Sequence, residues 1–137
     1  MLRVPNTLSD VYVTDQLLSR PGKPDYLRER VAVRDIWKQM VSNPTEVPGL
    51  LVDRAMEICG AVAGGISIYE EPGEVFRWHD LRGTLERFAG ETTPRNNSPC
   101  GIALDEKSAV LVQSPERAYS WLAEKNVSIP ECLLVPL

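Results

Sequence analysis

The stretch GETTPRNNSPCGIALD (residues 90–105) decides how this chain is interpreted. It contains two prolines, two glycines and several hydroxyl and amide side chains, a composition that favours turns over helix or strand. An irregular segment of this length inside a compact domain is uncommon and is often a lid or a binding loop. We therefore expect residues 90–105 to form an ordered loop with a functional role.

Composition sets the outer limits on the protein class. A chain of 137 residues, 43% hydrophobic and 25% charged, has the size and make-up of one globular domain. The formal charge is −4 and basic residues are interspersed with acidic ones, so nucleic acid is not an expected partner. No apolar run approaches the roughly 20 residues of a membrane span, and no signal peptide pattern opens the chain. We expect a cytoplasmic protein that does not bind membranes.

Helical periodicity begins after an N-terminal segment rich in proline. Residues 1–24 predict an arm or linker with a short helix at 15–19, and residues 25–137 predict the domain. Apolar residues at helical spacing predict an amphipathic helix over 26–41. Thr45 is expected to be the N-cap of a second helix, which should end at Gly60.

Strand patterns dominate the remainder of the chain. The turn at Pro72-Gly73 predicts an antiparallel hairpin of strands 62–69 and 75–81. In the second strand Phe76, Trp78 and Asp80 should share one face. Further expected elements are a short helix at 84–88, strands at 109–112 and 131–137, the last one buried, and a helix capped by Ser114. The fold class expected is α+β, or α/β in three layers, with a mainly antiparallel sheet flanked by helices.

The motifs AVAGGISIYEE, FRWHDLRG, GETTPRNNSPCGIALD and the terminal CLLVPL together resemble the GAF domain family, most closely the GAF input domains of bacterial sensor histidine kinases. The resemblance covers residues 25–137, and TTPRNNSPCG is its most specific part. It implies a sheet flanked by helices, a ligand pocket between the sheet and its covering loops, and dimerisation through the flanking helices. It also implies a role as a small-molecule or redox input domain in signal transduction.

The family pattern continues beyond a strand such as CLLVPL with another sheet strand and a closing helix, which this sequence lacks. The sheet is therefore expected to be incomplete at its C-terminal end. Unpaired strand edges seek partners. We expect either that a second chain completes the sheet or that two strands pair directly in an altered order.

Cys100 is the most chemically suggestive residue of the loop. A thiol between Pro99 and Gly101, with Arg95 nearby in sequence, could serve redox sensing or ligand attachment. The alternative is a small buried side chain that fixes the loop. Cys59 and Cys132 lie in segments expected to be core, and the three cysteines suit a reducing compartment.

Candidate ligand-binding residues lie on the second strand and the loop. Arg77, His79 and Arg95 could form a cationic rim for a carboxylate or phosphate, or they could simply pair with acidic neighbours such as Glu70, Glu74 or Asp80. Trp78 and Trp121 could line a pocket for a ring-shaped ligand or belong to the core. The expected site comprises Arg77, Trp78, His79, Arg95, Ser98 and Cys100. One histidine and no paired carboxylate spacing indicate no metal, and no cofactor is identified.

Trp37 on the first helix has two interpretations. With Val33, Ile36 and Met40 it could form a seam between two copies of the chain, or it could pack onto its own sheet.

The function that we expect is regulatory and non-enzymatic. A small molecule or a redox change would shift the flanking helices of a homodimer and so bias an output domain such as a histidine kinase. One alternative is a cysteine-dependent enzyme similar to the GAF-like free methionine sulfoxide reductases. Another is a module that serves only for dimerisation.

Overall fold

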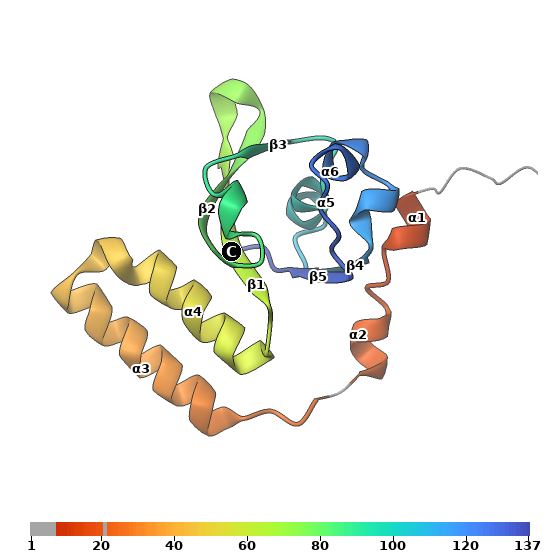
Figure 1. Cartoon of the computed structure of the whole chain (residues 1–137). Coiled ribbons are helices and arrows are strands. Elements are labelled where there is room, and N and C mark those ends of the chain that lie inside the picture. The colour runs from red at the N-terminus through yellow and green to blue at the C-terminus, as the bar shows by residue number, and fades with distance from the viewer. Residues whose placement is uncertain (1–7, 21) are drawn as a thin grey trace, which may run out of the picture. The chain divides into compact units, whose positions relative to one another are not determined.

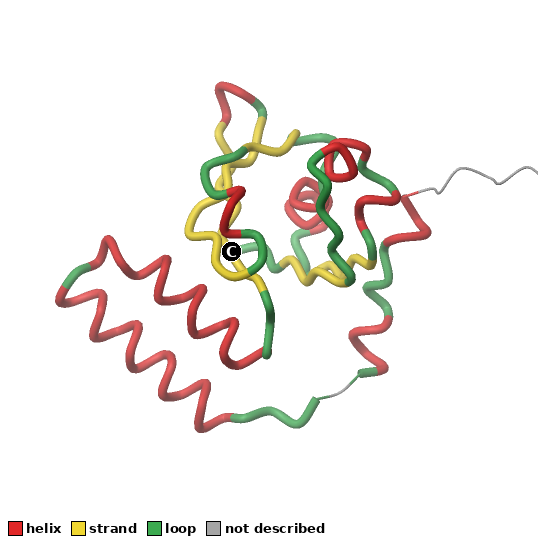
Figure 2. Tube along the Cα trace, in the orientation of Figure 1, coloured by secondary structure: helices red, strands yellow, loops and turns green. Residues whose placement is uncertain are grey.

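The protein combines helices with antiparallel sheets, which confirms the expected α+β class (Figures 1 and 2). The computed structural model describes residues 8–20 and 22–137. Contacts divide the chain into two compact units, each described by itself below. The central unit is Lys23–Thr93, and the terminal unit is Met1–Gly22 together with Pro94–Leu137. No helix within the described ranges is long and apolar enough to cross a membrane.

Two helices open the central unit. The side chain of Asp25 accepts a hydrogen bond from the backbone N–H of Arg28 at 3.0 Å and so caps α3 (Tyr26–Ser42). A 3₁₀ turn, η1 (Pro44–Glu46), leads into α4 (Val47–Cys59). Thr45 lies inside this turn, so its expected role as an N-cap is wrong. Gly60 adopts a left-handed conformation and ends α4 where the sequence predicts.

A hairpin follows the helices and confirms the expected antiparallel pairing. β1 (Ala63–Glu70) and β2 (Val75–Gly83) are joined by the 3₁₀ turn η2 (Glu71–Gly73). After the short turn η3 (Glu86–Phe88), β3 (Thr92–Pro94) continues the sheet on the other side of β2. Trp78 joins this region through two backbone bonds, donating to Glu91 O at 2.9 Å and accepting from Gly90 N at 2.8 Å.

A β-bulge interrupts β2 near its end. Ile66 lies opposite His79 but Gly64 lies opposite Arg82, so β2 contributes an extra residue, and Asp80 has φ of 51°. The extra residue shifts the side-chain alternation by one. Leu81, expected on the face opposite Phe76, is consequently buried as Phe76 is.

The central unit is layered as helix, helix and sheet (Figure 1). α4 packs on β1 and β2, where Val52 is buried and the Met56 side chain would touch any Cβ added at Gly64. α3 packs on α4 and on η1. Ala32 is the one buried residue of α3, so this helix contributes little to the core.

The segment expected to be an irregular loop consists mostly of regular secondary structure. Residues 90–105 contain β3 and most of α5 (Pro99–Glu106), so the expectation of a long loop is wrong. The buried Ser98 caps α5 by accepting from Gly101 N at 3.2 Å, and Pro99 occupies the first turn. The same Ser-Pro signal at Ser114 starts only a 3₁₀ turn, η4 (Pro115–Arg117), before α6 (Ser120–Glu124).

The terminal unit is built on a second, two-stranded sheet. β4 (Val110–Gln113) pairs antiparallel with β5 (Glu131–Leu134). The short helices α1 (Leu8–Val11) and α2 (Gln16–Ser19) flank Tyr12, which bridges to Val112 of β4. The core of this unit is formed by Val11, Ala103, Val110 and Val112. Residues 10–20, expected within an arm or linker, thus contribute a fully buried side chain, Val11.

The strands form two sheets, and the last strand is only partly covered. Leu133 and Val135 are exposed, so the expectation of a buried terminal strand is wrong in the single chain. The reason is that β5 has one neighbour, β4, and alternates its side chains between a covered face and an open one.

Gly83 provides a test of the hairpin geometry. Its φ is 72°, and a Cβ built there would lie 2.0 Å from the carbonyl oxygen of Val62. We expect Gly83→Ala to lower the free energy of unfolding by about 3 kcal/mol, because backbone collision adds to the left-handed cost of roughly 1–2 kcal/mol. Gly60→Ala is the matched control, since its φ is 64° but its Cβ would meet nothing within 4 Å. Urea unfolding of both variants measures the difference, and equal losses would contradict the assigned register.

Candidate functional site

The six expected site residues fall in both units. Arg77, Trp78 and His79 lie on β2 of the central unit. Arg95, Ser98 and Cys100 belong to the terminal unit, where they surround the start of α5. Each unit thus holds three of the six residues.

Arg77 is engaged by an acidic neighbour within the hairpin. Its Nε and Nη2 donate to the two carboxylate oxygens of Glu70 at 2.5 and 3.1 Å, and its Nη1 donates to Gly90 O at 2.8 Å. These bonds hold the pKa of Glu70 below its ordinary value. The structure thus supports the pairing alternative rather than a cationic rim, because a bidentate carboxylate already fills the guanidinium fork.

Trp78 and His79 belong to the hairpin surface and its local aromatic cluster. The Trp78 ring meets Phe88 edge-on, with centroids 6.4 Å apart, and the Arg87 guanidinium lies 4.7 Å from the centre of the Phe88 ring. His79 is half-buried opposite Ile66 of β1. These contacts are those of a packed sheet face.

Arg95, Ser98 and Cys100 are brought together by the entry into α5. Arg95 Nη2 lies 2.6 Å from Asp105 Oδ1, so a carboxylate neutralises this cation as well. The Arg95 carbonyl lies so close to Gly101 that an added Cβ would approach it to 2.1 Å. Trp121 Nε1 donates to Asn97 O at 2.7 Å and fastens the same turn to α6. The motif RNNSPCG is therefore explained by the geometry of a helix start.

A groove of about 440 Å³ runs between α3 and α4, apart from all six expected residues. Apolar and charged side chains of both helices line it. The lining residues are Leu27, Arg28, Val31, Ala32, Asp35, Arg54, Glu57 and Ile58.

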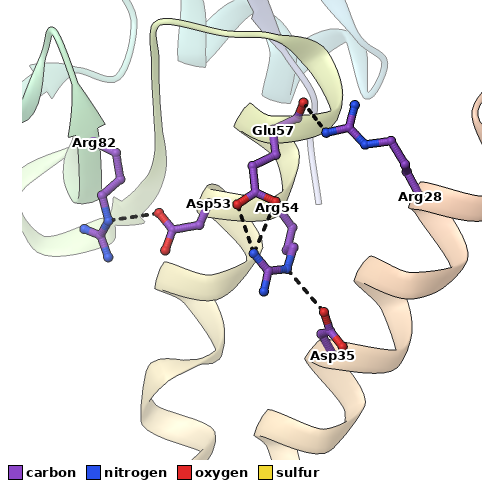
Figure 3. Close-up of polar contacts among 6 residues, drawn as sticks. All are labelled: Arg28, Asp35, Asp53, Arg54, Glu57 and Arg82. Carbon is purple, nitrogen blue, oxygen red and sulfur yellow. Dashed lines mark hydrogen bonds and ion pairs between the residues drawn. The ribbon is translucent and has the colours of Figure 1, made fainter.

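A chain of polar contacts joins β2, α4 and α3 around this groove (Figure 3). Arg54 contacts Glu57 of its own helix at 3.0 Å and Asp35 of α3 at 3.5 Å. Arg28 of α3 donates to the backbone oxygen of Glu57 at 3.0 Å. On the other side of α4, Arg82 lies 3.3 Å from Asp53. The contact between α3 and α4 thus combines these charged groups with the apolar side chains that line the groove.

The orientation of α3 follows from this polar contact. Since Arg28 and Asp35 point toward α4, the apolar stripe of the helix points away from it. Val33 is 54% exposed, Trp37 63% and Met40 48%, and Tyr26 and Val41 are also exposed. Of the two interpretations of Trp37, packing onto its own sheet is wrong in the single chain, because α4 lies between α3 and the sheet.

An amphipathic helix over 26–41 implies that its charged residues, Arg28 and Asp35 among them, face solvent, so the sequence analysis missed the polar contact. A signal for it was present in α4, whose Arg54 and Glu57 stand three residues apart on one helix face. An amphipathic helix usually turns its apolar stripe inward, and this rule is reversed here.

The three cysteines are all within the described residues, and all are thiols. Cys59 is exposed at the end of α4, which corrects its expected place in the core. Cys100 and Cys132 are half-buried in the terminal unit.

No family model, curated protein or solved structure matches this chain. The resemblance to GAF domains therefore rests on the sequence motifs alone.

The ion pair of Arg77 and Glu70 makes stability depend on pH. Because the pKa of Glu70 is lowered in the folded state, its contribution is complete above the ordinary value of 4.5 and is lost as pH falls through the lowered pKa. We expect Glu70→Gln to destabilise the protein at neutral pH and to match the parent chain at strongly acidic pH. Denaturant unfolding at a series of pH values measures this convergence. Glu71→Gln is the control in the same hairpin turn, and an equal effect there would contradict the assignment.

Proposed function

We propose that this chain is a non-enzymatic regulatory module that works as a pair of identical chains joined along α3. The observation that carries the proposal is the exposed apolar stripe of Val33, Trp37 and Met40 on a helix of 17 residues. Contiguous apolar surface of this kind marks an interaction site on soluble proteins.

The energetics of α3 favour a further partner. Only Ala32 is buried, and the ion pair between α3 and α4, Asp35 with Arg54, is partly exposed, so it contributes roughly 0–1 kcal/mol. Burying a large apolar side chain is worth roughly 1.5–3 kcal/mol. The stripe therefore offers more stabilisation to an association than α4 now supplies to the helix.

The pattern of α3 fits a second copy in parallel orientation. Side chains at alternating spacings of three and four residues form a seam of Tyr26, Arg30, Val33, Trp37 and Met40. In a parallel pair of helices, the residue directly before Arg30 or Trp37 faces the partner's residue five positions further along the chain. Glu29 would then face the partner's Arg34, and Ile36 would face the partner's Val41. An antiparallel pair would offer Arg34 no acidic partner, so charge complementarity favours the parallel one.

Such a pair could carry a regulatory signal through α3. The groove lies on the side of α3 that faces α4, opposite the seam, and a small molecule entering it would change the spacing of these helices and so the balance between paired states. The GAF-like resemblance supports an output partner of the histidine kinase type.

Val33→Glu tests the seam directly. Placing a charge in each chain at the centre of the stripe should weaken association about a hundredfold, which corresponds to roughly 3 kcal/mol. Sedimentation equilibrium or light scattering over a range of concentrations measures the dissociation constant. Val62→Glu is the matched control, because Val62 is an exposed valine of the same unit outside α3.

The result expected is a parent dimer, a weakened Val33→Glu variant and an unchanged Val62→Glu variant. A monomeric parent chain at high concentration would refute the proposal. Equal weakening by both substitutions would place the interface elsewhere.

Charge reversal tests the parallel orientation. Glu29→Arg alone and Arg34→Glu alone should each weaken the dimer about fivefold, because an exposed pair is worth roughly 0.5 kcal/mol and occurs twice by symmetry. The double variant should recover the parent affinity at low salt. Additive weakening in the double variant would exclude the parallel register.

A further inference from the structure

A row of three side chains crosses the sheet of the terminal unit. Cys132 of β5 lies opposite Val112 of β4, and Tyr12 lies opposite Val112 on its other side. Directly opposite residues of antiparallel strands project to the same face. Val112 packs with Ala103 of α5 in the core of this unit, so α5 covers the face that carries the row.

Cys100 in the first turn of α5 lies close to this row. Cys100 stands three residues before Ala103 and so lies on the same side of α5, which packs on both β4 and β5. Burial raises the pKa of Cys132, and a charge on Cys100 raises it further. The hydroxyls of Tyr12 and Tyr119 are themselves hydrogen bonded at 2.5 Å. Two thiols, one on α5 and one on β5, thus face the interface between this helix and the sheet.

The two thiols are not equivalent. Burial, and secondarily the charge on Cys100, raises the pKa of Cys132 to about 11, so Cys132 is a protonated thiol at neutral pH. Cys100 lies in the first turn of an eight-residue helix capped by Ser98 and is half-buried. Cys100 is therefore the better attacking sulfur, and Cys132 is placed to respond.

We propose that Cys100 and Cys132 form an oxidisable thiol pair whose substrate is a hydroperoxide and whose product is an intramolecular disulfide between α5 and β5. This inference is independent of the pairing along α3, because both thiols and their neighbours belong to the terminal unit.

The reaction proceeds in two balanced steps. The Cys100 thiolate attacks the terminal peroxide oxygen, an S–O bond forms, the O–O bond breaks, and the departing oxygen takes a proton to leave as alcohol or water. The sulfur is oxidised by two electrons to sulfenic acid. Cys132 then attacks that sulfur, the S–S bond forms, and the hydroxyl leaves as water with the proton of Cys132.

The test uses the whole chain with the exposed third thiol removed, Cys59→Ser. The protein is treated with a small excess of hydrogen peroxide, denatured, alkylated with N-ethylmaleimide and weighed intact. We expect loss of both alkylation sites and a mass lower by two hydrogen atoms, in a species that stays monomeric on a non-reducing gel and reverts on reduction. With Cys132→Ser added, dimedone should trap a sulfenic acid on Cys100. With Cys100→Ser added instead, Cys132 should remain alkylated.

Several outcomes would overturn the pair. Two alkylated thiols after peroxide treatment would mean that the sulfurs do not react together. Disulfides found only between two chains would show that the thiols react through contact between molecules and not within one terminal unit. Faster oxidation of Cys132 than of Cys100 would reverse the assigned roles. The Cys59→Ser result decides the matter even where a second serine prevents folding, and it can fail while the α3 dimer persists.

Discussion

Arg54 reaches from α4 to Asp35 of α3 while it also holds Glu57 of its own helix, and this contact sets the direction in which α3 faces. Charged groups bury less apolar surface than a leucine seam would, so they attach α3 weakly. They also leave the side of α3 that carries Trp37 without a covering element in the single chain. The proposed pairing and the proposed signal both depend on this inversion, because a helix docked by its apolar stripe would offer no seam.

Local signals predicted much of the fold because they act within a few residues. Gly60 and the Pro72-Gly73 turn each fix a boundary through their own backbone chemistry, and the onset of helical periodicity after residue 24 located the start of α3. The main failure was over residues 90–105, where turn-forming composition concealed the start of α5. Ser98 and Pro99 carry the same helix-start signal that was used to predict a helix after Ser114. At Ser114 the backbone is left-handed, and only a 3₁₀ turn forms after it.

The candidate site was harder to predict because an arginine can bind a ligand only if no neighbouring carboxylate already occupies its guanidinium group. Hairpin register brings Glu70 next to Arg77, and helix periodicity brings Asp105 near Arg95. Glu70 was named among the possible partners from the sequence, whereas Asp105 was not, and neither geometry could be predicted. The proximity of Cys132 to Cys100 depends on strand pairing and on helix packing between segments about 30 residues apart, which no local pattern encodes.

The terminal unit is assembled from both ends of the sequence, with the central unit inserted between them. Val11 packs with Val110 and Val112, so these contacts close a loop of about 100 residues, and closing it costs more chain entropy than closing the local β1–β2 hairpin. During synthesis the central unit can therefore fold before β4 has left the ribosome, while Val11 waits for its partners. Val11 precedes the whole central unit in the chain and yet is buried after that unit has folded.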